Sequence, residues 1–215
     1  MRFAAVTDIH GRVERVKKLA EVLKNEDLNG ILIAGDITHF SGSEVAENVL
    51  SPLLELKMRI VAVHGNCDGR DVPEFLNNLG ISAHNRRVEF EGVGIVGIGG
   101  SNITPFHTIW ELTEEEIADI LRSNYRDGDV ILSHVPPKNT VADRVHFGFH
   151  VGSRALREFI EEKQPPLVIC GHIHEGRGVD RVGKTVVLNP GPLFRGYYAV
   201  VDIKKNGVEV ELKRI

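Results

Sequence analysis

The chain has 215 residues, of which 42% are hydrophobic and 26% are charged. A chain of this length buries roughly 70% of the surface that its unfolded form exposes, so we expect one globular domain over residues 1–215. The net charge of -4 argues against a polycationic surface, and the presence of only two cysteines argues against a disulfide framework.

The first ten residues, MRFAAVTDIH, lack a long apolar run. We therefore expect neither a signal peptide nor a membrane span, and no membrane partner. Two cysteines outside a disulfide framework fit the reducing cytoplasm, where we expect the protein to be located. The sequence leaves the oligomeric state open.

The chain begins with an apolar run of strand type and a helical segment. Asp8 and His10 come shortly after the run at 3–6, with Thr7 between the run and Asp8. Between 13 and 24, apolar residues recur at helical spacing with charged residues between them, which predicts a helix with one packed face. This order is typical of the βαβ units of α/β proteins.

The second unit repeats this order. Asp36 follows the apolar run at 30–34, and His39 lies three residues further along the chain. We expect His39 to be a candidate for contact with a substrate. The segment 43–57 also has a helical pattern, which Pro52 interrupts.

A third apolar run, at 60–63, leads into the tetrapeptide GNCD, in which Asn66 provides an amide oxygen. We expect Asp68 to anchor the loop that follows Asn66. His64 stands at the end of the strand, where packing is a more common role than chemistry.

The segment 86–100 breaks the βαβ rhythm and predicts a β-hairpin. Its glycines at 92–97 match a dinucleotide-binding pattern, but more strand follows where a phosphate-binding helix would have to begin. We therefore interpret them as part of a glycine-rich hairpin. Thr113 and Glu116 form a capping-box pattern, which predicts a helix that stops near residue 126.

His134 follows a fourth apolar run, at 130–133. Further along, His150 lies in a loop just before a predicted helix, whose free N-terminal amides favour anions. We expect His150, together with Arg144 or His146, to contact a phosphate group or to donate a proton. The alternative is a solvated histidine in a helix-entry loop.

The last part of the chain provides a helix at 153–163, a fifth apolar run at 167–170 and a terminal hairpin at 197–215. His172 and His174 follow the fifth run. Because antiparallel hairpins occur beside parallel units, we expect an α/β fold with two mixed β-sheets, packed together and covered by helices in four layers.

Seven polar side chains thus stand beyond the carboxyl ends of five apolar strands: Asp8, His10, Asp36, Asn66, His134, His172 and His174. In open α/β sheets these ends border the ligand crevice, so we expect the seven to converge. Carboxylate, imidazole and amide donors without thiolate favour manganese, iron or zinc at a catalytic site. Seven donors suit two ions better than one, with Asp36 as the expected bridge. Each residue alone has an ordinary structural interpretation, but the joint pattern favours a metal site.

The ordered motifs resemble the signature of the calcineurin-like metallophosphoesterase superfamily over residues 8–174. They are Asp8-Ile9-His10, Gly35-Asp36, Gly65-Asn66-Cys67-Asp68, His134 and Gly171-His172-Ile173-His174. The resemblance implies a four-layer αββα sandwich and two divalent metal ions, with manganese preferred and iron, zinc or nickel as alternatives. It implies that one ion is held by Asp8, His10 and His174, the other by Asn66, His134 and His172, and both by Asp36. A metal-bridging hydroxide would attack phosphorus in line.

Cys67 stands where most members of that superfamily carry a histidine credited with helping the leaving group. The same GNCD variant resembles a small single-domain branch associated with phosphodiester hydrolysis. We therefore expect a phosphodiesterase acting on a small phosphate ester, with phosphomonoesters as weaker substrates. The expected catalytic residues are Asp36, Asn66, His150, His39 and, at the position of the usual histidine, Cys67.

Two other functions stay open. Some proteins of this fold act as protein-assembly scaffolds with incidental metal binding, as in the retromer subunit that resembles the same branch. A lost ligand would be the expected mark of that role, and an exposed apolar patch would favour it. The third function is that of a small nuclease, although the sequence has no basic stripe for an extended nucleic-acid partner.

Overall fold

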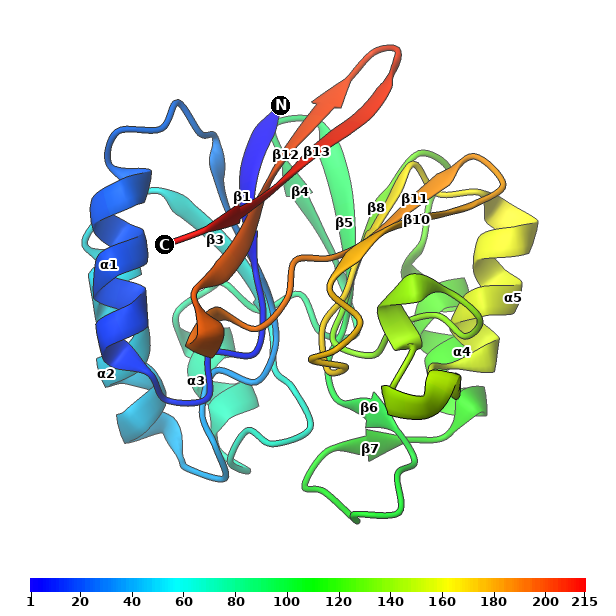
Figure 1. The fold of residues 1–215 in the computed structure, drawn as a ribbon, viewed down its shortest axis with the longest axis horizontal. Coiled ribbons are helices and arrows are strands. Elements are labelled where there is room, and N and C mark those ends of the chain that lie inside the picture. Colours follow the sequence, from blue (N-terminus) through cyan, green and yellow to red (C-terminus); the bar gives the residue numbers. More distant parts are fainter.

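A computed structural model describes residues 1–215 (Figure 1). The five-stranded sheet has the order β13-β12-β1-β2-β3 and consists of β1 (Arg2–Val6), β2 (Gly30–Ala34), β3 (Arg59–Val63), β12 (Tyr197–Lys204) and β13 (Gly207–Arg214). The six-stranded sheet has the order β10-β11-β9-β8-β5-β4 and consists of β4 (Arg87–Phe90), β5 (Val93–Ile98), β8 (Val130–Ser133), β9 (Leu167–Ile169), β10 (Gly178–Val182) and β11 (Thr185–Asn189). A short parallel pair is formed by β6 (Ser101–Asn102) and β7 (Glu111–Leu112).

Five α-helices and three 3₁₀ turns connect these strands. The helices are α1 (Val13–Leu23), α2 (Ser43–Leu54), α3 (Val72–Asn78), α4 (Glu114–Asn124) and α5 (Arg154–Lys163). The turns are η1 (Val141–Asp143), η2 (His146–Gly148) and η3 (Leu193–Arg195). None of the helices has both the length and the apolar character needed to cross a lipid bilayer.

Three hydrophobic clusters divide the molecule into four layers. The first includes Leu19 and packs α1, α2 and α3 against the outer face of the five-stranded sheet. The second includes Phe3 and Leu132 and fills the space between the two sheets. The third includes Leu156 and packs α4 and α5 against the six-stranded sheet. Figure 1 shows helices flanking both sheets, and the expected αββα sandwich with two mixed sheets is confirmed.

The central strands are apolar throughout because both of their faces are covered. In β1, Ala4 and Val6 belong to the cluster under the helices, whereas Phe3 and Ala5 belong to the cluster between the sheets. Successive side chains of a strand point to opposite faces, so a strand buried on both sides needs a continuous apolar run. Only the residues beyond its end are free to be polar.

The expected helices are present with small differences at their ends. The capping box of Thr113 and Glu116 starts α4, and the Ser153 hydroxyl accepts from the Leu156 amide at the start of α5. Helix α2 ends at Leu54 rather than at 57, and Lys57 takes a left-handed φ of 55° that ends the turn. The hairpins β4–β5 and β12–β13 match the expected antiparallel pairs.

Helix α3 and the hairpin β10–β11 are two elements that the sequence patterns do not predict. Helix α3 has only seven residues, too few for a helical period to stand out. Strand β10 pairs antiparallel with β11, at the edge of the six-stranded sheet.

Candidate metal centre

The loops that follow the parallel strands are bonded to one another at one edge of the sandwich. The Asp8 amide donates to the Gly35 carbonyl at 3.0 Å, and the His10 amide donates to the Asp36 carbonyl at 2.9 Å. In the other sheet, the Gly171 amide donates to the His134 carbonyl at 3.1 Å. These bonds hold the strand-end residues of each sheet together.

Four of the seven expected ligands have left-handed backbone conformations. The φ angles are 51° for Asp8, 49° for His10, 51° for Asp36 and 67° for His172. Such conformations cost of order 1 kcal/mol or more for residues other than glycine, and they concentrate at functional sites. Four such residues within one group of loops indicate that the backbone is shaped to aim side chains rather than to maximise stability.

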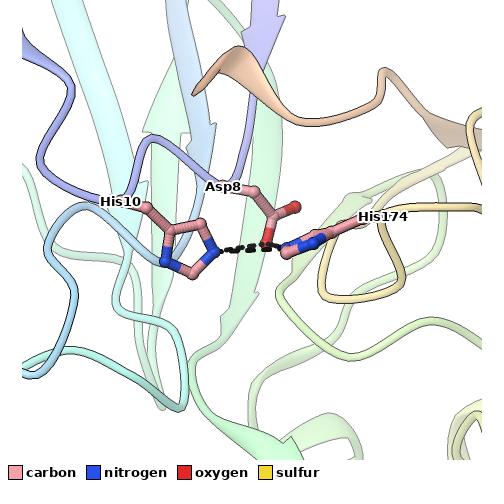
Figure 2. A group of neighbouring side chains, drawn as sticks. All are labelled: Asp8, His10 and His174. Carbon is pink, nitrogen blue, oxygen red and sulfur yellow. Dashed lines mark hydrogen bonds and ion pairs between the residues drawn. The ribbon is translucent and has the colours of Figure 1, made fainter. Parts of the chain in front are cut away.

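One cluster of facing side chains consists of Asp8, His10 and His174 (Figure 2). The two imidazole Nε2 atoms lie 3.2 Å apart. Asp8 Oδ1 lies 3.3 Å from the Nε2 of His174 and 3.8 Å from that of His10. Three potential ligand atoms from two different sheets therefore point at one small space.

The Asp8 carboxylate is oriented by its other oxygen. Asp8 Oδ2 accepts from the Thr7 hydroxyl at 2.9 Å and from the His172 amide at 3.2 Å. Asp8 Oδ1 is buried and has no hydrogen-bond partner. An unpaired buried carboxylate oxygen is costly, and a cation between Asp8, His10 and His174 would satisfy it.

The second cluster is centred on His134, which is fully buried. Its Nδ1 lies 2.7 Å from the Ala34 carbonyl oxygen, an acceptor, so Nδ1 carries a proton and donates it. Its Nε2 lies 2.9 Å from Asn66 Oδ1. Since the amide oxygen is also an acceptor, a second proton on His134 or a cation between His134 and Asn66 would satisfy both atoms. The donor types in both clusters fit divalent cations of the manganese, iron or zinc kind.

Asp36 lies between the two clusters. Its Oδ1 is 3.5 Å from His134 Nε2, and its Oδ2 is 3.5 Å from His10 Nε2. The Cys67 amide donates to Oδ1 at 2.8 Å and fixes the carboxylate. One oxygen of Asp36 therefore faces each cluster, as a bridging ligand requires.

The electrostatics of the site favour bound positive charge. Burial, the largest single effect, would raise the pKa of Asp36, but the charge and hydrogen bond of His134, the charge of His10 and the Cys67 amide together hold that pKa well below its usual range. Burial would likewise lower the pKa of His134, but the Asp36 carboxylate, together with Asp8 and the Ala34 carbonyl, raises that pKa to about 9. The same negative potential that holds this proton on His134 would attract a divalent cation in its place.

His172 lies beside the second cluster. Its ring packs against that of His134, with centroids 5.2 Å apart. Burial, followed by the charge of His134, lowers the pKa of His172 to about 4. A neutral imidazole is the form that binds a metal ion.

Asp68 anchors the loops around this centre, as the sequence indicated. Its buried carboxylate accepts from the amides of Gly65 at 2.8 Å and Thr38 at 2.7 Å, which ties the loop after β3 to the loop after β2. His64 is buried and packs against His84 and Trp110. The surroundings of His64 therefore fit a role in packing.

The two histidines expected to contact the substrate lie in different environments. His39 is exposed, and its Nδ1 is 3.2 Å from Nδ1 of His10. His150 Nδ1 is 2.6 Å from Oδ1 of buried Asp143. His39 lines a cavity of about 230 Å³ beside the first cluster, whereas His150 is not among the residues that line it.

Cys67 is partly buried next to Asn66, whose side-chain amide lies 3.5 Å from its Sγ. Burial, followed by the charge of Asp36, raises the pKa of the Cys67 thiol well above its usual range. A thiol that holds its proton so strongly is a weak proton donor.

Phe194 and Arg12 also line the 230 Å³ cavity, and no sequence pattern pointed to either. Phe194 packs edge-on against His10 and His174, with centroids 5.5 and 5.0 Å apart. It reaches this position because the amides of Leu193 and Phe194 donate to the carbonyls of Thr7 and Asp8. A larger cavity, of about 670 Å³, is lined by residues such as Gln164 and contains none of the seven ligand candidates.

Comparisons with known proteins identify a family and related folds. The sequence profile of the calcineurin-like phosphoesterase family matches residues 1–176. The uncharacterised protein MJ1162 of Methanocaldococcus jannaschii is 39% identical, over 98% of this chain and 96% of its own. The crystal structure of TT1561 from Thermus thermophilus has a TM-score of 0.75 at 19% identity, covering 98% of this chain and 97% of that one. A structure described as a novel archaeal phosphodiesterase has a TM-score of 0.59 at 18% identity, covering 99% and 100%.

Proposed function

Because the chain belongs to the calcineurin-like phosphoesterase family, we propose that it is a dinuclear-metal-dependent phosphodiesterase. The family supports a phosphoric ester hydrolase with a metal-binding site. The preference for diesters and the identity of the metal go beyond what the family supports and are our proposals. We propose a small phosphate ester as the substrate and the cytoplasm as the location, where the two free cysteines are compatible with reducing conditions.

The observation that carries the proposal is the arrangement of Asp36 between two groups of facing ligand atoms. Asp8, His10 and His174, whose ligand atoms face one another, would hold one cation. We propose that Asn66, His134 and His172 would hold the other, and that Asp36, close to both His10 and His134, would hold both. Two divalent cations would supply Lewis acidity that makes water nucleophilic near neutral pH and offsets the charge of a phosphoryl group. We propose manganese, with iron, zinc or nickel as alternatives, because the donors are oxygen and imidazole nitrogen.

The chain's own residues position these groups. Thr7 and the His172 amide orient Asp8, the Ala34 carbonyl fixes the His134 ring, and the Cys67 amide holds Asp36. Such supporting contacts keep ligands in one orientation and raise the affinity for metal. An ester phosphate bound over Asp36 would then be held in one orientation. Its leaving group would lie opposite the side from which the attacking oxygen approaches phosphorus.

The preference for diesters rests on residues 65–68 and on a fold neighbour. Residue 67 is a cysteine, so the site lacks the usual imidazole at this position. The Cys67 thiol is a weak proton donor, because burial raises its pKa. The GNCD sequence resembles the branch associated with phosphodiester hydrolysis. A solved archaeal phosphodiesterase shares the fold, which supports the proposal at the level of architecture.

Metal removal tests the proposal directly. We expect protein treated with a chelator to hydrolyse neither a bis-aryl phosphodiester nor the matching aryl phosphomonoester. Addition of Mn²⁺ should restore turnover, with a higher kcat/KM for the diester. Elemental analysis before and after treatment gives the number and identity of the bound metals. Absence of metal-dependent turnover of either ester would rule out the hydrolase, and a higher kcat/KM for the monoester would rule out the diesterase preference.

We propose His39 as the group that hydrogen-bonds the leaving-group oxygen as negative charge develops on it. When His10 Nε2 binds a metal, its Nδ1 carries a proton and donates to Nδ1 of His39 across the 3.2 Å contact. The Nε2–H of the neutral His39 imidazole can then donate a hydrogen bond to the leaving-group oxygen. His150, the other candidate for this role, is held by Asp143 outside the cavity and is the weaker of the two.

Substitution of His39 distinguishes these candidates. We expect His39→Ala to lower kcat/KM by about 100-fold for a diester with an alkyl leaving group, because loss of one donor to a developing oxyanion costs about 10²–10³-fold. The loss should be much smaller for a p-nitrophenyl ester, whose leaving group needs little such stabilisation. His150→Ala serves as the matched comparison, measured with both esters and at equal metal content. Equal losses for the two leaving groups in His39→Ala would contradict a donor role for His39.

One observation favours the scaffold alternative. Apolar side chains of two adjoining loops are exposed, among them Phe106 at 82% and Phe147 at 96%, and the loops are joined by a bond from the Asn102 side chain to the Val151 carbonyl. The presence of all seven candidate ligand residues favours the enzyme. For the nuclease alternative, the net charge of -4 provides no general attraction for an extended nucleic acid.

A further inference from the structure

A groove leads away from the first metal cluster toward the start of α1. The cavity of about 230 Å³ is lined by His10, Arg12, His39, His174 and Phe194. A neighbouring cavity, of about 450 Å³, is lined by Gly11, Arg12, Val13, Glu14, Arg15 and Phe194. The two cavities share Arg12 and Phe194 as lining residues, so they adjoin each other between the ligands His10 and His174 and Arg15.

The walls of this groove carry two arginines without a salt bridge. Neither Arg12 nor Arg15 has an ion-pair partner within 4 Å or a side-chain hydrogen bond, although the C-terminal residue Ile215 lies near Arg15 at Gly196. Glu14 is the only acidic residue on the wall, and it is paired with Lys17 at 2.8 Å. Unpaired guanidinium groups beside a phosphoester site are suited to a further anion.

Phe194 forms an apolar surface between the metal cluster and these arginines. One edge of its ring meets His10 and His174, and the guanidinium of Arg195 lies 5.4 Å from the ring centroid. The ring is only partly buried. A planar group of a ligand can therefore rest on Phe194 while charged groups on either side of it face the metal cluster and the arginines.

We propose that this groove selects phosphodiesters that carry a second phosphate, bound by Arg12 and Arg15, with a planar ring against Phe194. The inference rests on the proposed phosphodiesterase function and names its substrate class: a diester of a phosphorylated nucleoside. The helix α1 begins at this point, and the positive end of its dipole adds to the attraction of Arg12 and Arg15 for an anion.

A matched pair of substrates tests the selection. Thymidine 5′-(p-nitrophenyl phosphate) and its 3′-phosphorylated form differ only in the second phosphate. The Mn²⁺-loaded protein should hydrolyse the phosphorylated form with a kcat/KM at least about 10-fold higher, as expected for charge-assisted hydrogen bonds. Arg12→Gln and Arg15→Gln should each bring the ratio of the two kcat/KM values toward one. Lys18→Gln, which removes the same charge from an exposed position of α1, should leave the ratio as it is.

Binding of a product-like nucleotide separates this inference from the hydrolase proposal. By calorimetry, adenosine 3′,5′-bisphosphate should bind the Mn²⁺-loaded protein at least about 10-fold more tightly than adenosine 5′-monophosphate, and Arg12→Gln should abolish the difference. Inorganic pyrophosphate, which lacks the ring, should bind more weakly than the bisphosphate. Equal affinities for the two nucleotides, or equal effects of Arg12→Gln and Lys18→Gln, would overturn the groove as a phosphate subsite. Absence of turnover with retained selective binding would refute the hydrolase alone.

Discussion

Replacement of Asp36 by asparagine is expected to lower kcat/KM for a phosphodiester by more than about 100-fold, since loss of even a residue that supports a metal ligand costs 10–100-fold. Asp36 is the one side chain with an oxygen facing each cluster, at 3.5 Å from His10 Nε2 and 3.5 Å from His134 Nε2. Asparagine keeps the shape and the oxygen that accepts from the Cys67 amide. It removes the negative charge that two neighbouring cations would share.

The Asp36→Asn variant should also bind less metal. Elemental analysis should show fewer than two ions per chain after Mn²⁺ loading and desalting, whereas circular dichroism should match that of the parent. Asp119→Asn is the matched control, because Asp119 is an exposed aspartate on α4 without a hydrogen-bond partner. Full activity and full metal content in Asp36→Asn would show that Asp36 is not the bridge.

The sequence was most informative for segments whose burial restricts the residue types that they can contain. A strand covered on both faces must be apolar, so Asp8 after β1 and His134 after β8 stand out against the runs that precede them. The parallel order of such strands then fixes the edge at which these side chains meet. For this reason the layers and the convergence of the ligand candidates could be expected from the sequence alone.

The remainder of the site depends on contacts between distant segments. Phe194 lies in η3, a three-residue turn without periodic pattern, and reaches the centre only because its amide and that of Leu193 bond to the loop after β1. Asp143, the partner of His150, is buried through bonds within the irregular segment 139–152. Local sequence patterns carry no information about such pairings, so the positions of Phe194 and Asp143 became visible only in the structure.

Glycines near the ligands show the same dependence on distant contacts. A Cβ on Gly65 would overlap the carboxylate and the backbone nitrogen of Asp36, which approach from the neighbouring strand-end loop. A Cβ on Gly171 would overlap the Thr7 side chain that orients Asp8. The glycines before Asn66 and His172 therefore allow two loops to touch, rather than supplying unusual φ angles.

Gly65→Ala is accordingly expected to reduce both metal binding and activity. The methyl group must push the Asp36 carboxylate away from its position between His10 and His134, and a shift of about 1 Å in a catalytic group costs about 100-fold in rate. Overpacking should also lower the free energy of unfolding by about 1–3 kcal/mol. The measurements are kcat/KM on the aryl diester, metal content, and urea denaturation.

Gly80→Ala separates a local effect on the centre from a general loss of stability. Gly80 has a φ of 70°, and no atom lies within 4 Å of the position that a Cβ would take there, so alanine costs about 1 kcal/mol of backbone strain without touching Asp36. We expect Gly80→Ala to unfold at lower urea but to keep its metals and its kcat/KM. If Gly65→Ala behaves in the same way, the close approach of Gly65 to Asp36 has no part in holding the bridging carboxylate. If only Gly65→Ala loses metal, the contact between the loops after β2 and β3 sets the position of the ligand that both cations would share.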